Sequence, residues 1–187
     1  NKGARKEMTE VTNHHHESEA ALSHKKASPK KFKVAIYTVS SSRFQNKTLR
    51  DESGEIAKAS LEKANHEFLY ALIDDSRPLI RFSLYKSLVE DQCDAVIFLG
   101  GTGLSPRDVT FEAIAPLLDK TLDGFGEIFR RLSYDSIGSP AIMTRAIGGV
   151  VDSRVVFCLP GSPDAVSLGM ELILKELPHA IFIARGT

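Results

Sequence analysis

The sequence predicts an α/β fold, a three-layer α/β/α sandwich with a mostly parallel central sheet. Short apolar, β-branched segments alternate along the chain with segments of helical periodicity, as in parallel strands joined by right-handed crossovers. Residues 94–99 (DAVIFL) are almost entirely apolar, as expected of a strand buried on both faces. No internal repeat is visible, so one domain is expected.

The first half of this domain alternates strand and helix. Residues 32–39 (FKVAIYTV) form a β-branched apolar run between Lys and Ser, which predicts a buried strand. Residues 53–64 repeat apolar side chains every three or four positions, which predicts a helix. Residues 67–73 (EFLYALI) predict the second strand. Residues 79–88 predict the second helix, because Pro78 suits a first helical turn.

The second half continues this alternation after the strand at 94–99. Residues 108–118 are predicted as a helix, and residues 141–146 and 155–159 as two strands around a turn with Gly148 and Gly149. Residues 162–177 form the closing helix, since their apolar side chains recur at helical spacing. A helical apolar stripe lies within residues 125–134. Core packing and contact between subunits both remain open for it.

Composition excludes several classes of function. The 187 residues hold 24 Lys and Arg against 24 Asp and Glu, so a strongly basic nucleic-acid binder is not expected. No apolar run approaches the roughly 20 residues that span a bilayer, so no membrane partner is expected. Cys93 and Cys158 lie in apolar segments and are interpreted as reduced, buried thiols. With no signal-peptide pattern, a cytoplasmic location is expected.

The zero net charge is unevenly distributed. Residues 1–31 carry seven Lys and Arg against four Glu, whereas residues 32–187 carry 17 against 20. The first segment has no aromatic residue and no apolar period, so residues 1–31 are predicted to be a flexible tail and residues 32–187 the domain. The histidine run at 14–16 is open to metal binding or to a solvated role. An origin of the residues before Met8 in a cloning vector also remains open.

In open parallel sheets, ligands bind beyond the carboxyl ends of the strands, which directs attention to four loops. After the first strand come Ser40, Ser41 and Ser42, whose hydroxyls suit a phosphate or a polar ring edge; a simple polar turn is the alternative. After the second strand comes Asp75, next to another Asp. This pair suits Mg²⁺, and the alternative is favourable charge at a helix start.

The loop after the third strand gives the strongest signal. It consists of Gly100, Gly101, Thr102 and Gly103, with Asp108 following at the expected helix start. Three glycines in four residues let the backbone approach a ligand and present its amides. The loop lacks the Gly-Lys-Ser/Thr of a Walker loop and the spacing of the dinucleotide fingerprint. A generic glycine turn is the alternative.

The loop after the last strand carries Gly161 and Ser162 at the start of a helix, which is another position suited to an anion. A Pro/Gly turn with a serine cap is the alternative. These anion-binding features belong to a net acidic domain. A metal ion that bridges carboxylates and phosphates would reconcile the two observations.

These loops together resemble the MoaB/MogA family of molybdenum cofactor biosynthesis proteins, and MoaB most. The resemblance extends from about residue 32 to residue 183. The motifs that carry it are residues 100–103 (GGTG), 106–110 (PRDVT), 39–43 (VSSSR), 50–54 (RDESG), 124–127 (GFGE), 144–146 (TRA) and 159–163 (LPGSP).

The resemblance implies Mg²⁺- and ATP-dependent adenylylation of molybdopterin, which yields adenylyl-molybdopterin and pyrophosphate. It implies catalytic and metal-binding roles for Asp75 and Asp108, and a homo-oligomer, a trimer or a hexamer. The substrate-binding residues that it implies are Ser40, Ser41, Ser42, Gly100, Gly101, Thr102, Gly103, Glu127, Gly161 and Ser162.

Two alternatives remain open. A non-catalytic molybdopterin carrier or scaffold would keep the glycine loops and lose the acidic residues, whereas this chain retains Asp75 and Asp108. A CinA-type nucleotide pyrophosphatase usually carries Gly-Gly-Leu-Gly and paired Asp residues in the third loop. Thr102, and Arg107 before Asp108, fit the molybdopterin branch better.

Overall fold

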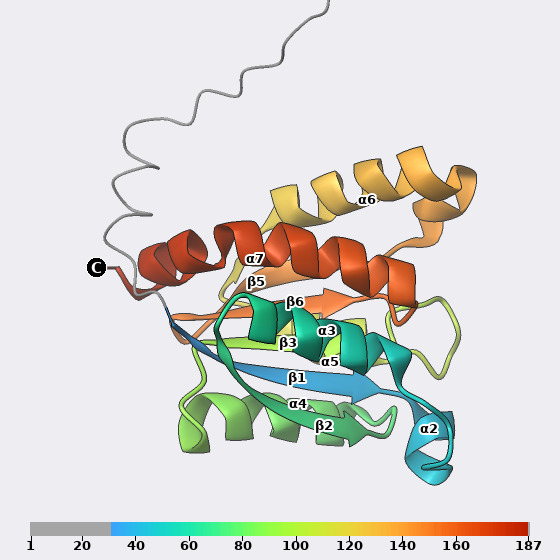
Figure 1. Cartoon of the computed structure of the whole chain (residues 1–187), viewed down its shortest axis with the longest axis horizontal. Coiled ribbons are helices and arrows are strands. Elements are labelled where there is room, and N and C mark those ends of the chain that lie inside the picture. Colours follow the sequence, from blue (N-terminus) through green and yellow to red (C-terminus); the bar gives the residue numbers. More distant parts are fainter. Residues whose placement is uncertain (1–30, 187) are drawn as a thin grey trace, which may run out of the picture.

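In the computed structural model, which describes residues 31–186, six strands form one sheet in the order β2-β1-β3-β6-β5-β4 (Figure 1). The strands are β1 (Lys33–Val39), β2 (Glu67–Ile73), β3 (Ala95–Leu99), β4 (Lys120–Thr121), β5 (Ile147–Val151) and β6 (Arg154–Leu159). The first four strands in this order run parallel, and β5 and β4 are antiparallel to their neighbours. The predicted α/β/α sandwich with a mostly parallel sheet is therefore confirmed.

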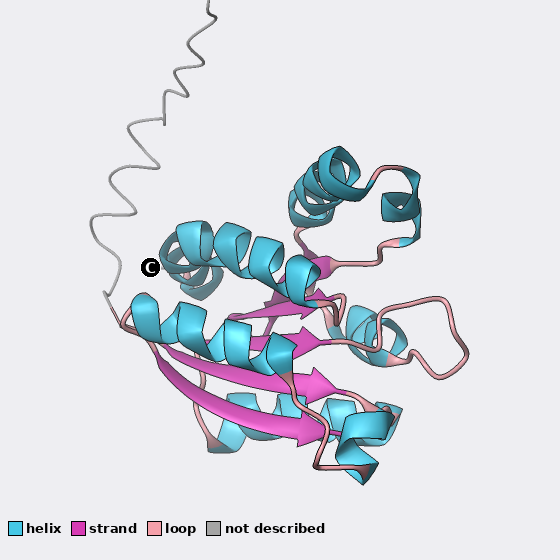
Figure 2. Cartoon of the chain, turned by 45° about the vertical axis from the view of Figure 1, so that its right-hand side comes forward, coloured by secondary structure: helices cyan, strands magenta, loops and turns pink. Residues whose placement is uncertain are grey.

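Helices cover both faces of the sheet (Figure 2). They are α2 (Ser41–Gln45), α3 (Glu52–Lys63), α4 (Arg77–Tyr85), α5 (Thr110–Ile114), α6 (Asp123–Ile137) and α7 (Pro163–Arg185). Three shorter segments are the π-helix η1 (Lys86–Glu90) and the 3₁₀ helices η2 (Ala115–Leu117) and η3 (Ser139–Met143). None of the helices among residues 31–186 is both long enough and apolar enough to cross a bilayer.

The core consists of two clusters, one on each face of the sheet. In β3, Ala95, Ile97 and Leu99 pack on the face covered by α3 and α7, whereas Val96 and Phe98 pack toward α4 and α5. All five residues are fully buried, which explains the continuous apolar run in the sequence.

Two predicted elements near the C-terminus need correction. Residues 141–146 are not a strand: η3 occupies their first half, and β5 lies further on, over the glycine pair that was predicted as a turn. Gly148 lies in β5 opposite Phe157 of β6, whose ring stands 2.8 Å from an added Cβ, so the strand requires glycine at this position. The closing helix α7 also continues beyond residue 177, with Pro178 inside it.

Other elements differ in extent from their predictions. The helix predicted at 108–118 begins at Thr110 and ends as the 3₁₀ helix η2. The segments α2 and β4 were not predicted. The apolar stripe of α6 divides between core and solvent: Phe129 is buried and Phe125 packs on the core, but Ile128 and Leu132 are exposed.

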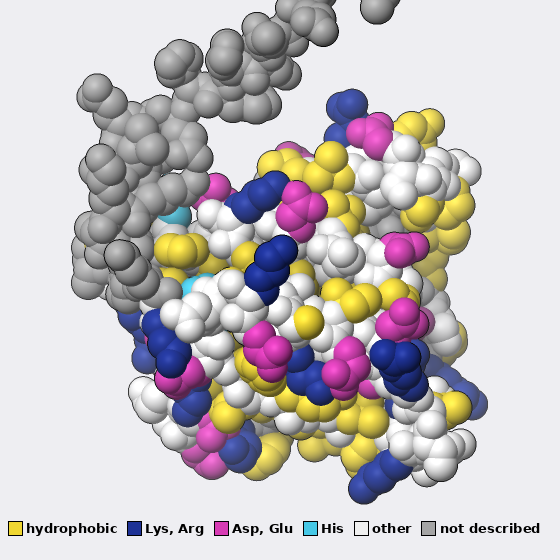
Figure 3. Space-filling model, in the orientation of Figure 1, with side chains coloured by type: hydrophobic (Ala, Val, Ile, Leu, Met, Phe, Trp, Pro, Cys, Tyr) yellow, Lys and Arg dark blue, Asp and Glu magenta, His cyan; other side chains and the backbone are white. Residues whose placement is uncertain are grey.

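Neither described cysteine forms a disulfide, and both are buried, as predicted. Burial raises the pKa of the Cys93 thiol to about 11 and also raises that of Cys158. Acidic and basic side chains are interspersed on the face drawn in Figure 3. The predicted tail, with its histidine run and the residues before Met8, lies outside the described residues, apart from Lys31.

Candidate functional site

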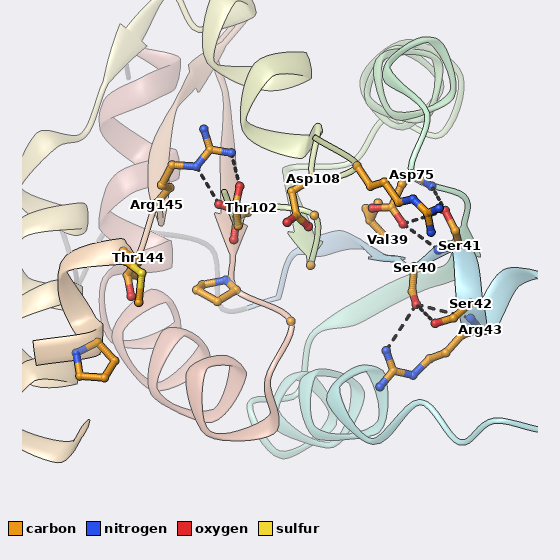
Figure 4. A pocket seen from close by; sticks show the side chains of 18 residues that line it. Val39, Ser40, Ser41, Ser42, Arg43, Asp75, Thr102, Asp108, Thr144 and Arg145 are labelled. Atoms are coloured by element: carbon orange, nitrogen blue, oxygen red, sulfur yellow. Dashed lines mark hydrogen bonds between the residues drawn. The ribbon is translucent and has the colours of Figure 1, made fainter. Parts of the chain in front are cut away.

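A cavity of about 530 Å³ opens at the carboxyl ends of the parallel strands (Figure 4). It lies within the size range of small-molecule sites. Ten of the twelve residues predicted for the site line this cavity: Ser40, Ser41, Ser42, Asp75, Gly100, Gly101, Thr102, Gly103, Asp108 and Gly161. The strand-end rule thus predicted where a cavity forms from distant segments of the chain.

The other two predicted residues lie outside this cavity. Glu127 lines a separate hollow beside α6, together with Arg130. Ser162 is the N-cap of α7, where its hydroxyl accepts a hydrogen bond from the amide of Ala165 at 3.4 Å, and it lines another hollow. The substrate-binding roles of Glu127 and Ser162 remain predictions.

The serine loop fixes the orientation of Asp75. The amide and the hydroxyl of Ser41 both donate to Oδ2 of Asp75, at 2.7 and 2.9 Å. The second oxygen, Oδ1, accepts no hydrogen bond from residues 31–186 and lies 3.0 Å from where a Cβ on Gly101 would stand. Asp75 therefore holds one oxygen fixed and directs the other toward the glycine loop (Figure 4).

Asp108 approaches the same loop from its other end. Its Oδ2 accepts a hydrogen bond from the amide of Ser105 at 3.1 Å and lies 2.6 Å from where a Cβ on Gly103 would stand. A side chain at residue 103 would collide with this carboxylate. Glycine at that position is therefore what allows a carboxylate and the loop backbone to meet in the pocket.

The backbone of the loop presents unpaired amides. The N–H groups of residues 101–104 donate no hydrogen bond to any acceptor within residues 31–186. The carbonyls of the same stretch are paired: Gly101 accepts from the amide of Thr110 at 2.8 Å, and Thr102 and Gly103 accept from Arg145. Residues 101–103 line the cavity, and successive free amides there suit an anion.

Arg145 had no individual role in the sequence-based prediction. It lies between η3 and β5, within the motif at residues 144–146, which carried the family resemblance without a separate role for the arginine. Its partners are the glycine loop, Glu112 and the ring of Phe111, whose centroid lies 4.9 Å from the guanidinium carbon. The Arg145 guanidinium beside it lowers the pKa of Glu112.

The motif at residues 50–54 supports the pocket from behind. Ser53 is 1% exposed, and its hydroxyl donates to the carbonyl of Gly161 at 2.8 Å. Asp51 caps α3 and accepts a hydrogen bond of 2.5 Å from the hydroxyl of Tyr70. Burial and this carboxylate raise the pKa of Tyr70 to about 12. The motif therefore holds the pocket wall without entering it.

The acidic groups of the pocket suit a metal ion that arrives with a ligand. No group of three or more His, Cys, Asp or Glu side chains that could hold a metal occurs within residues 31–186. The pocket instead contains two carboxylates, those of Asp75 and Asp108. Mg²⁺ commonly binds one or two protein carboxylates and completes its shell with water and substrate phosphates. The donor set therefore fits magnesium bound together with a phosphate compound.

The fold and the site define an α/β domain with a polar, glycine-lined cavity at the carboxyl edge of its sheet. Residues 35–179 match the family model described as "Probable molybdopterin binding domain". Molybdenum cofactor biosynthesis protein B of Bacillus subtilis is 44% identical over 161 residues, which cover 84% of this chain and 93% of that protein. The molybdopterin adenylyltransferase of Pyrococcus furiosus is 37% identical over 166 residues, which cover 87% and 96%.

A solved structure agrees with these sequence relationships. The crystal structure of the tungsten cofactor synthesizing protein MoaB from Pyrococcus furiosus superposes with a TM-score of 0.78 and 38% identity. The superposition covers 84% of this chain and 99% of that one. The chain belongs to the MoaB family of molybdenum cofactor biosynthesis proteins.

Proposed function

We propose that this chain is a molybdopterin adenylyltransferase that uses ATP with magnesium. The observation that carries the proposal is one pocket that combines two carboxylates with three consecutive unpaired amides, those of residues 101–103. A relative 37% identical to this chain bears the name molybdopterin adenylyltransferase. The carboxylates suit a magnesium–nucleotide complex, and the amides suit a phosphate group.

The proposed reaction transfers AMP between two phosphate compounds. An oxygen of the terminal phosphate of molybdopterin attacks the α-phosphorus of ATP and forms a new P–O bond. The bond from the α-phosphorus to the bridging oxygen breaks, and pyrophosphate leaves with that electron pair. The step needs no protein nucleophile, and both described cysteines are buried outside the pocket. Catalysis then depends on positioning and on stabilising charge.

Each part of the pocket has a role in this proposal. The amides of residues 101–103 hold a phosphate group, and Ser41 fixes the carboxylate of Asp75. Asp75 and Asp108 would hold magnesium, which neutralises negative charge on the phosphates as pyrophosphate leaves. Ser40, Ser42 and Gly161 line the same cavity and shape the space for the substrates.

We also propose a homo-oligomer, a trimer or a hexamer, in keeping with the family resemblance. Ile128 and Leu132 on α6 are large apolar residues exposed in the single chain, which supports a contact surface there. Analytical ultracentrifugation of the full chain gives the mass of the assembly directly. A monomer at micromolar concentration would contradict this part of the proposal.

Replacement of one acidic residue tests the reaction. Asp108→Ala should lower kcat for adenylyl-molybdopterin formation by about a hundredfold or more, because the carboxylate stabilises charge that develops in the transition state. Binding of molybdopterin should change little. The measurement is product formation with and without Mg²⁺. Asp164→Ala is the matched control, since it removes an acid from the same end of the sheet outside the cavity.

The same assay separates the alternative functions. Unchanged turnover of Asp108→Ala would contradict the assignment. Cleavage of ATP without molybdopterin would instead indicate a nucleotide pyrophosphatase. Tight binding of molybdopterin by the unaltered protein without any turnover would indicate a carrier or scaffold.

A further inference from the structure

Arg145 joins two parts of the molecule that are distant in the sequence. It precedes β5, in the antiparallel half of the sheet, and its side chain reaches the glycine loop that follows β3 (Figure 4). Nε donates to the carbonyl of Thr102 at 2.8 Å, and Nη2 donates to the carbonyl of Gly103 at 2.6 Å. One guanidinium therefore fixes two successive peptide groups.

Fixing these carbonyls also fixes the direction of the amides. The described chain contains no cis peptide bond, so each carbonyl points opposite to the N–H of the following residue. The N–H groups of Gly103 and Leu104 consequently point away from Arg145. Neither has an acceptor within residues 31–186, and Gly103 lines the cavity.

Glu112 on α5 holds the guanidinium in this orientation. Nη1 and Nη2 of Arg145 donate to the two carboxylate oxygens of Glu112, the latter at 3.3 Å. With the two carbonyls, these bonds engage four of the five N–H donors of an arginine. The charge of Arg145 is paired with a carboxylate. Its donors are directed at the protein, which distinguishes Arg145 from a phosphate-binding arginine.

We propose that the Arg145–Glu112 ion pair is a positioning device for the glycine loop. It orients the peptide groups after Thr102 and Gly103 so that their amides face a bound phosphate. Arg145 is thus a positioning residue. The inference rests on the proposed function only for the identity of the phosphate compound, because the geometry concerns the binding of any phosphate at this loop.

The proposal and a direct electrostatic role predict opposite effects for one variant. Glu112→Gln removes a negative charge near an anion pocket. If charge alone mattered, this variant would bind phosphates more tightly. If Glu112 positions Arg145 and thereby the loop, the variant binds them more weakly, since the amides lose their fixed direction.

The experiment measures binding of inorganic pyrophosphate and of Mg-ATP to the full chain by isothermal titration calorimetry. Glu112→Gln and Arg145→Lys should each raise Kd by about tenfold, because lysine keeps the charge but loses the planar fork. Arg81→Lys is the matched control. Arg81 donates through Nε to the carbonyl of Ala113 on the same helix α5, at 3.1 Å, and does not bond to the loop. Its replacement should leave Kd unchanged.

Each outcome decides the question. Unchanged or tighter pyrophosphate binding by Glu112→Gln overturns the proposal. The proposal is also overturned if both variants unfold at lower temperature but bind the probes with the same Kd as the unaltered protein. In that case the ion pair has a purely structural role. If the unaltered protein binds neither probe, the proposal fails. If pyrophosphate binding weakens as expected but no molybdopterin is adenylylated, this inference stands and the proposed reaction fails.

Discussion

The dipeptide Gly-Gly occurs twice in the chain, and the two copies have different backbone conformations and different surroundings. Gly100 and Gly101 follow β3 and have φ angles of +98° and +65°, with their loop open to the pocket. Gly148 and Gly149 lie in β5, paired with β6 in an extended strand. An added Cβ on Gly149 would stand 2.5 Å from the carbonyl oxygen of Lys120 on β4.

Protein atoms occupy the space of the absent side chain at both pairs, so the difference lies in the backbone and its surroundings. The first pair has left-handed φ angles and lines the cavity beside Asp75, and the amide of Gly101 has no acceptor among residues 31–186. The second pair is extended and packs between β4 and β6 within the sheet. The same two letters therefore mark a cavity-lining loop in one place and a packed strand in the other. Only the neighbouring elements distinguish the two.

The largest effect is expected when the first pair is altered. In Gly101→Ala, the new Cβ would lie 2.3 Å from Oγ1 of Thr110 and 3.0 Å from Oδ1 of Asp75. The loop must shift, so kcat/KM for adenylylation should fall by about a hundredfold. Displacement of catalytic groups by about 1 Å lowers rates to this extent. Steady-state kinetics measures this loss.

A control separates backbone strain from displacement of the site. Gly186 has a similar φ of +70°, but no atom lies within 4 Å of an added Cβ. Gly186→Ala should lower stability by about 1–2 kcal/mol, the cost of the left-handed conformation, and leave kcat/KM unchanged. Equal activity of the two variants would show that the first pair has no special role.

An intermediate effect, on stability and not on activity, is expected at the second pair. Gly149→Ala should lower the free energy of unfolding by about 1–3 kcal/mol, because backbone atoms of β4 cannot move aside easily. Urea denaturation measures this change, and kcat/KM of the folded protein should stay the same. Gly124→Ala on α6 is the control, since no atom lies within 4 Å of its added Cβ. A fall in kcat/KM of Gly149→Ala with an unchanged free energy of unfolding would contradict the comparison.

The smallest effect distinguishes the two regions by pH. The guanidinium of Arg145 lowers the folded-state pKa of Glu112 below its usual 4.5, so the ion pair stabilises the protein above pH 4.5. That stabilisation is lost as the pH falls below 4.5 through the folded pKa. The difference in unfolding free energy between the unaltered protein and Glu112→Gln should therefore shrink below pH 4.5.

The Gly149→Ala difference involves no titrating group and should stay constant over the same range. Thermal unfolding from pH 3 to pH 7 measures both differences. A Glu112→Gln difference that persists undiminished at pH 3 would contradict the ion-pair explanation.

Apolar patterning predicted the parallel half of the sheet well and the antiparallel half poorly. Residues 67–73 are a strand with the predicted bounds, and β3 differs from its prediction by one residue. Residues 141–146 looked like a strand because they are apolar, yet Ile142 is 80% exposed and Met143 is 56% exposed. The true strand β5 contains glycines without intrinsic strand preference, and its place depends on Phe157 and on β4.

The candidate site shows the same division between local and long-range information. The strand-end rule placed the glycine loop, the serines and both acidic residues at one cavity, because these follow directly from the order of strands. The role of Arg145 could not be predicted in this way. Arg145 contacts Thr102 and Gly103, which precede it by 43 and 42 positions in the sequence. No residue near Arg145 in the sequence indicates these contacts.

The distribution of the pocket along the chain has a consequence for biosynthesis. The serine loop and the loops of Asp75 and Gly101 leave the ribosome before Arg145 and Gly161, which complete the cavity. A nascent chain that ends before β6 therefore lacks the neighbour strand that accepts the amide of Gly100 through Leu159. A ligand that binds only the completed cavity would therefore stabilise the folded chain by mass action.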